Sequence, residues 1–157
     1  MTRTRVARAL PWLGAWLMAQ GVAAAAGWLV ALRTDEGDDS TSGIRRLRVM
    51  SRVELRPHHP QLSRVRVDLL MAGGELDLTG VPRVPGGVDV TAHVVMAGLE
   101  ITVTHDWRVW AEGGGVEVDR RLRRAGEERF ADLRLHARVV LGGLTLGAGE
   151  PAVGTAR

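Results

Sequence analysis

The chain has 157 residues and a formal net charge of +3; it contains no cysteine and no lysine, so all 21 basic side chains are arginine. The absence of cysteine excludes disulfides, thiolate metal sites and cysteine nucleophiles. Because the net charge is small, we expect no nucleic acid among the partners of this protein.

The first predicted element is an apolar segment, Leu10–Leu32, that contains no charged side chain. A helix of this length rises about 1.5 Å per residue and can cross a hydrocarbon core of roughly 30 Å. Trp12 and Trp28 lie near its two ends, where indole rings favour the membrane interface. We therefore predict a membrane anchor over residues 1–33. A cleaved signal peptide is the alternative, because the small residues at Val22–Ala26 fit a signal peptidase.

An acidic segment rich in Ser, Thr and Gly follows at residues 34–43 and is predicted to be a linker. The basic amino terminus favours the cytoplasm, which predicts a single-pass protein of the cell membrane with its remaining chain outside the cytoplasm. Four arginines lie close to the other end of the anchor and favour the opposite orientation: Arg33, Arg45, Arg46 and Arg48.

Residues 44–149 form the predicted folded domain, in which short strands alternate with breaks of small residues, and residues 150–157 are predicted to be a disordered tail. Apolar residues recur at every second position, so that Leu99 and Ile101 share one face of a strand. The strands before the breaks alternate in the same way. This period predicts that their last inward-facing residues are Met71, Met96 and Leu141.

The break recurs in five related segments, SRVEL, AGGEL, AGLEI, GGVEV and GGLTL. Small residues there indicate tight turns, because Gly permits positive φ and close backbone approach. The predicted turn residues are Ala72, Gly73, Ala97, Gly98, Gly114, Gly115, Gly142 and Gly143. One such unit cannot bury its apolar face alone, whereas stacked units can. The pattern therefore predicts a mainly β fold, a short β-solenoid or β-helix-like stack; an antiparallel β-sandwich is the alternative.

The segment VVMAGLEITVTHDWRV, residues 94–109, resembles a recurring pattern in the carboxy-terminal domain of LiaF-like cell-wall-active-antibiotic response proteins. Further copies of that pattern are LRVMSRVEL, VDLLMAGGELDLTGV and VVLGGLTLG, and the resemblance spans about residues 47–149. It implies a non-enzymatic envelope domain, which in the best-known members restrains a membrane sensor kinase. The chain differs from the pattern at residues 104–106, where Thr-His-Asp replaces Pro-Glu-Gly, and by a polar insertion at residues 120–132.

We expect no catalytic site, cofactor or metal site in this chain. His58-His59 has no evident third ligand, and His105-Asp106 has no Ser or Cys nucleophile beside it. Gly113–Gly115 is not a phosphate loop, because the chain has no lysine. Trp107 and Trp110 are expected to pack in the core or to cap an end of the stack.

Charged side chains are expected on the outer surface. Glu75, Glu100 and Glu117 recur at one place in the repeat and should form a solvated row interleaved with arginine. Two arginine clusters are candidates for contact with anionic lipid or a partner, at about 1 kcal/mol per residue near a bilayer. They consist of Arg45, Arg46 and Arg48, and of Arg120, Arg121, Arg123 and Arg124. An ordinary solvated surface is the alternative interpretation of both clusters.

These features predict a membrane-anchored interaction or regulatory protein of the cell envelope, with another membrane protein, such as a sensor kinase, as its partner. A structural module that self-associates through exposed strand edges, or that binds the membrane surface, is the alternative.

Overall fold

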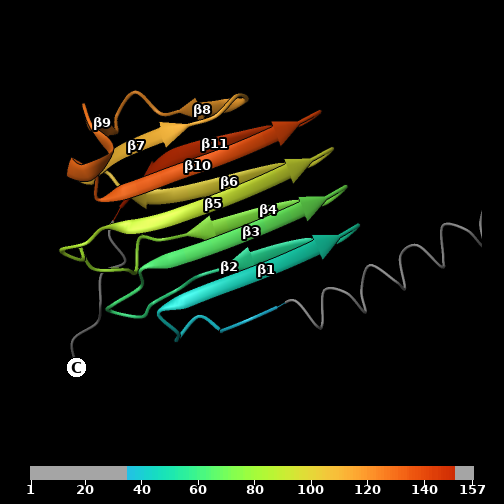
Figure 1. Ribbon diagram of the computed structural model, residues 1–157, viewed down its shortest axis with the longest axis horizontal. Helices are drawn as coiled ribbons and strands as arrows, with labels where there is room; N and C mark the ends of the chain where they lie inside the picture. Colours follow the sequence, from blue (N-terminus) through green and yellow to red (C-terminus); the bar gives the residue numbers. More distant parts are fainter. Residues whose placement is uncertain (1–34, 151–157) are drawn as a thin grey trace, which may run out of the picture.

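The computed structural model describes residues 35–150 (Figure 1), so the predicted anchor over residues 1–33 lies outside the described residues, as does nearly all of the predicted tail. Among residues 35–150, no helix is long and apolar enough to cross a membrane.

The described chain contains eleven strands and one short 3-10 helix. The strands are β1 (Gly43–Val49), β2 (Arg52–Leu55), β3 (Arg64–Leu70), β4 (Gly73–Asp77), β5 (Val88–Val95), β6 (Gly98–Thr104), β7 (Arg108–Glu112), β8 (Val116–Val118), β9 (Arg123–Arg124), β10 (Leu133–Val140) and β11 (Gly143–Gly149), and the helix η1 is Glu128–Phe130. They form a six-stranded sheet, β1-β3-β5-β10-β7-β9, and a five-stranded sheet, β2-β4-β6-β11-β8.

The fold is mainly β, as predicted, and neighbouring strands within both sheets are parallel. From β1 to β8 the chain alternates between the six-stranded and the five-stranded sheet. We call one strand of the first sheet, together with the following strand of the second, a coil. This arrangement is compatible with the predicted β-helix-like stack. The alternative antiparallel sandwich is wrong, because it requires antiparallel neighbours.

The core lies between the two sheets and consists of stacked aliphatic rows. In the first sheet Val65 is in register with Val90, and in the second Leu76 is in register with Ile101, all with no exposed surface. Apolar residues at alternate strand positions thus meet their equivalents in the next coil and exclude water together. Trp107, expected in the core or as a cap, is 2% exposed and belongs to this core.

The last coil of the chain lies inside the stack rather than at its end. Strand β10 pairs with β5 on one side and β7 on the other, and β11 lies between β6 and β8 (Figure 1). The polar insertion at residues 120–132 provides the return path, since it contains β9 and η1 and leads directly into β10. The spatial order of the coils therefore differs from their order in the sequence.

The turn between the two strands of a coil differs from the prediction. Positive φ falls one residue before the small-residue break, at Met50, Met71, Met96 and Leu141, with φ between 49° and 53°. A residue in the left-handed conformation bends the chain, and the period-two alternation ends there. The side chain of that residue, which the alternation would place in the core, projects outward at the corner. The prediction that Met71, Met96 and Leu141 face the core is wrong, since their side chains are 49%, 54% and 80% exposed.

The break glycines have unequal roles. Gly73, Gly98 and Gly143 lack positive φ, and a Cβ on any of them would meet nothing within 4 Å, so the turn role predicted for them is wrong. Gly142 does permit close approach, because a Cβ there would overlap the carbonyl oxygen of Ala97 in the neighbouring coil. Gly115 has a φ of 76° and turns the chain between β7 and β8.

Candidate functional site

An exposed apolar strip, two residues wide, runs along the corner where the chain passes from the first sheet to the second. One row contains the last residues of four strands, all on the outer face of the sheet, and the other contains the left-handed corner residues. The apolar strip consists of Val49, Leu70, Val95 and Val140, and of Met50, Met71, Met96 and Leu141.

Parallel register builds this strip. Val95 is paired with both Leu70 and Val140, and Leu70 with Val49. The backbone N–H groups of the three corner methionines continue the ladder and donate to Leu70, Val95 and Val140 over 2.8–3.0 Å. Because parallel strands lie about 4.8 Å apart, four coils give a strip about 14 Å long. The carboxyl ends of β1, β3, β5 and β10, where the strip lies, are on the right of Figure 1.

The backbone conformation of the corner residues is costly for their residue types. For a residue with a Cβ, the left-handed backbone conformation costs about 1–2 kcal/mol relative to the right-handed one, whereas Gly adopts the left-handed conformation freely. Four coils nevertheless place Met or Leu there, and none of these four side chains is buried. Strained residues that do not serve the core indicate a role on the surface.

The strip ends at the fourth coil in space. In the coil of β7 and β8, three residues, 113–115, join Glu112 to Val116. In the neighbouring coil of β10 and β11, seven residues join the partner of Glu112, His136, to the partner of Val116, Leu144. The coil formed by β7 and β8 therefore has no corner residue to cover Leu141, which explains why this side chain is the most exposed of the strip.

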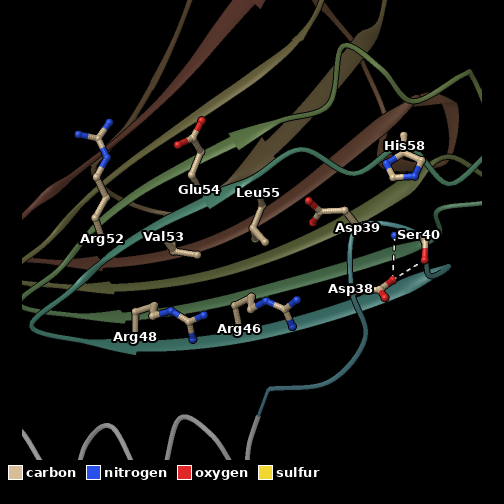
Figure 2. A pocket seen from close by; sticks show the side chains of 10 residues that line it. All are labelled: Asp38, Asp39, Ser40, Arg46, Arg48, Arg52, Val53, Glu54, Leu55 and His58. Atoms are coloured by element: carbon tan, nitrogen blue, oxygen red, sulfur yellow. Dashed lines mark hydrogen bonds between the residues drawn. The ribbon is translucent and has the colours of Figure 1, made fainter.

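A polar cleft of about 610 Å³ lies at the first end of the stack (Figure 2). Its walls are the loop Asp38–Ser40, the edge strand β2 and three arginines, and His58 lies at one end. Ser40 donates to the Asp38 carboxylate through its hydroxyl (2.6 Å) and its backbone N–H (2.9 Å). These hydrogen bonds, the hydroxyl above all, hold the pKa of Asp38 below its usual value. Asp38 therefore serves the loop structure and is a poor proton donor at neutral pH.

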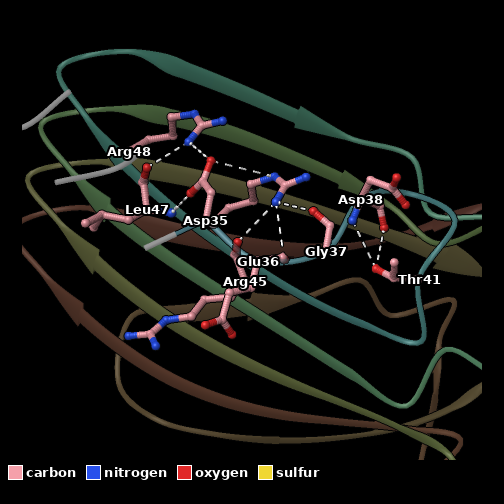
Figure 3. A network of polar contacts seen from close by, with 9 residues as sticks. Asp35, Glu36, Gly37, Asp38, Thr41, Arg45, Leu47 and Arg48 are labelled. Atoms are coloured by element: carbon pink, nitrogen blue, oxygen red, sulfur yellow. Dashed lines mark hydrogen bonds and ion pairs between the residues drawn. The ribbon is translucent and has the colours of Figure 1, made fainter. Parts of the chain in front are cut away.

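The acidic segment before the cleft packs along β1 (Figure 3). Glu36 pairs antiparallel with Arg45, and the Asp35 carboxylate accepts from the backbone N–H of Leu47 at 2.9 Å and from Arg48 at 2.6 Å. Arg46 donates to the carbonyl of Gly37 at 2.7 Å. The first predicted arginine cluster is thus largely engaged by the segment that was predicted to be a linker.

The second arginine cluster lies at the opposite end of the stack. Arg121 is paired with Asp119 at 2.8 Å, and its side-chain hydrogen bond lowers the pKa of Asp119 to about 2. Arg123 and Arg124 are exposed and form β9, the edge strand of the six-stranded sheet, with exposed Arg120 just before it. The structure therefore does not bring the two predicted clusters together.

The glutamate row is only partly continuous. Glu54, Glu75 and Glu100 are in register, but Thr145 separates Glu100 from Glu117. Arginine is interleaved as expected at the first end: Arg52 pairs with Glu75 at 3.4 Å, and Arg56 pairs with Glu54 at 2.5 Å. Within residues 35–150, no group of three His, Asp or Glu side chains is placed to hold a metal ion.

The sequence-based prediction missed the apolar strip. Its signal was nevertheless present as a dipeptide of two large apolar residues directly before four of the five breaks: Val49-Met50, Leu70-Met71, Val95-Met96 and Val140-Leu141. A strand with one buried face needs only one of two neighbouring residues to be apolar. In each pair the first residue falls on the outward face of the alternation, where the core needs no apolar side chain, and this extra apolar residue indicates the strip.

No protein-family model, no curated protein and no solved structure matches this chain.

Proposed function

We propose that this chain is a membrane-anchored, non-enzymatic interaction protein of the cell envelope, built as a short β-solenoid behind a single membrane span. The observation that carries the proposal is the apolar strip, an exposed and strained surface suited to contact.

The regulatory part of the proposal rests on the resemblance to LiaF-like proteins. That resemblance implies a partner of the sensor-kinase type, embedded in the same membrane and responding to cell-wall stress. Strand β2 offers a docking site for such a partner, since it is an edge of the five-stranded sheet and lies beside the polar cleft. An edge strand presents unpaired backbone groups to an incoming strand.

Self-association is the second candidate function, because the described stack has open strand edges at both ends. Strand β2 is the edge at one end, and β8 and β9 are edges at the other. Strands from two copies could pair there and lengthen the stack.

A site-specific crosslinking experiment tests both candidates. Because the chain has no cysteine, Glu54→Cys places a single photo-crosslinker on the β2 edge, and Glu117→Cys places one on β8 as the matched control. The proposal predicts a membrane-protein adduct from position 54, in native membranes, that position 117 does not give. Adducts of the chain with itself from both positions would favour self-association. A full-length chain that washes off the membrane with salt would contradict the anchor.

A further inference from the structure

We infer that the apolar strip is the membrane-contacting edge of the domain, with its Met, Leu and Val side chains inserted into the interfacial layer of the bilayer. The inference deepens the proposed function and rests on its membrane anchor. It assigns the orientation of the domain: the corner after β1, β3, β5 and β10 faces the lipid, and the opposite corner faces away.

The short tether to the anchor supports this orientation. Only two residues, Arg33 and Thr34, separate Leu32 from Asp35, and the three steps of extended chain span at most about 11 Å. The Asp35 carboxylate accepts hydrogen bonds from Leu47 and Arg48, which lie just before Met50, the strip residue of the first coil. The opposite corner, represented by Gln61, precedes β3, whose seven residues span about 23 Å. The anchor therefore brings the strip, rather than the opposite corner, close to the bilayer.

The composition of the strip fits a lipid interface. Its eight positions contain only Met, Leu and Val, and six of them are between 41% and 80% exposed. Arginines lie at its margins: Arg52, with a side chain 77% exposed, is two residues after Met50, and exposed Arg138 is two residues before Val140. Long basic side chains beside an apolar edge can reach phosphate groups while the apolar residues enter the acyl region.

The size of the strip argues against a second copy of the chain as its occupant. Six half-exposed aliphatic side chains offer only a few hundred Å² of apolar surface. A stable protein–protein interface buries about 800 Å² on each partner. A bilayer needs no complementary shape, and the anchor already supplies most of the attachment.

A single-cysteine fluorescence experiment on the full chain tests the inference. Met96→Cys, within the strip, and Gln61→Cys, at the opposite corner, each carry an environment-sensitive NBD label. The chains are reconstituted into phosphatidylcholine–phosphatidylglycerol vesicles that contain a spin-labelled lipid as quencher. We expect the label at position 96 to be blue-shifted and quenched several-fold more strongly than the label at position 61. Equal quenching at the two positions, in chains that float with the vesicles, would overturn the inference.

The outcomes separate this inference from the proposed function. A full chain that fails to float with vesicles contradicts the anchor itself. A blue shift at position 96 that appears in detergent without lipid, and grows with protein concentration, identifies a second copy as the occupant and overturns the lipid assignment.

A triple variant removes apolar side chains from the strip while keeping the backbone conformation of its corners. Asn accepts the left-handed conformation better than most residues, so Met50→Asn, Met71→Asn and Met96→Asn together should preserve the corners. The label is then placed at Leu141→Cys. We expect the triple variant to float as the parent does but to lose most of the quenching at position 141. Unchanged quenching would show that the methionines do not set the orientation and would overturn the inference.

Discussion

The neighbouring residues Gly142 and Gly143 provide a matched test of how the coils pack. A methyl group at position 142 would overlap the carbonyl oxygen of Ala97 and lie 3.1 Å from its carbonyl carbon and backbone nitrogen. The same group at position 143 would meet nothing within 4 Å. Gly142→Ala and Gly143→Ala therefore make the same chemical change, one residue apart, in very different surroundings.

The magnitude for Gly142→Ala follows from what must move. Ala97 cannot retreat freely, because its carbonyl oxygen accepts the backbone N–H of Gly143 at 3.2 Å and so belongs to the ladder between coils. Overpacking against such a group costs about 1–3 kcal/mol, and loss of the hydrogen bond adds about 1 kcal/mol. We expect Gly142→Ala to lower the free energy of unfolding by about 3 kcal/mol, which corresponds to a melting temperature lower by roughly 10 °C.

Gly143→Ala should behave differently. It removes backbone freedom from the unfolded chain at a position without positive φ, so its effect should lie between about zero and 1 kcal/mol of added stability. Thermal unfolding of the full chain in mild detergent, followed by far-ultraviolet circular dichroism, measures both variants. Equal melting temperatures for the two variants would show that the coils do not pack as closely at Gly142 as described, and the reasoning would fail.

Three further predictions concern other parts of the stack. A chain ending at Asp132 lacks β10 and β11, whose neighbours on both sides then lose their partners, so its cooperative melting transition should disappear; a chain that still melts near the parental temperature would contradict the inserted coil. Arg134 donates a hydrogen bond to Asp89 and lowers the pKa of Asp89 below 3.8, so this pair stabilises the fold above about pH 4 and the contribution is lost as the pH falls through the lowered pKa. Asp89→Asn should therefore be less stable than the parent at neutral pH and flatten the loss of stability below pH 4 in acid titrations; parallel pH profiles would count against the pair. Asp35→Ala removes the acceptor of the Leu47 N–H, so hydrogen exchange of that amide should quicken about tenfold while amides in β10 keep their rates.

The interior of the domain could be predicted from the sequence because it depends on one local rule. Alternation with period two placed Val65, Leu76, Leu99 and Ile101 inside, and all four are buried. Register between coils then follows from aligning like with like, as the pairing of Leu76 with Ile101 shows. Sheet direction did not follow from the same pattern, since alternating strands fit parallel and antiparallel neighbours equally well.

The corners could not be predicted by extending the same rule. Period two holds only while the backbone stays extended, and one left-handed residue breaks it, so Met71, Met96 and Leu141 emerge into solvent. The position of the last coil was also beyond a local pattern. Nothing within β10 or β11 shows that they pair with β5 and β7, or with β6 and β8, because such pairing is decided by contacts far apart in the chain.

These two features are linked through the fourth coil in space. The inserted coil contributes Val140 and Leu141, so the apolar strip reaches its full length only when β10 enters between β5 and β7. In a chain whose last coil has not inserted, the strip has residues from only three coils. Strands of both sheets that normally flank β10 and β11 then have unpaired edges, which are prone to pair with other chains. Completion of the core and completion of the proposed membrane edge are therefore the same event. The exposed apolar strip thus depends on the pairing of β10 with β5, two strands that lie far apart in the sequence.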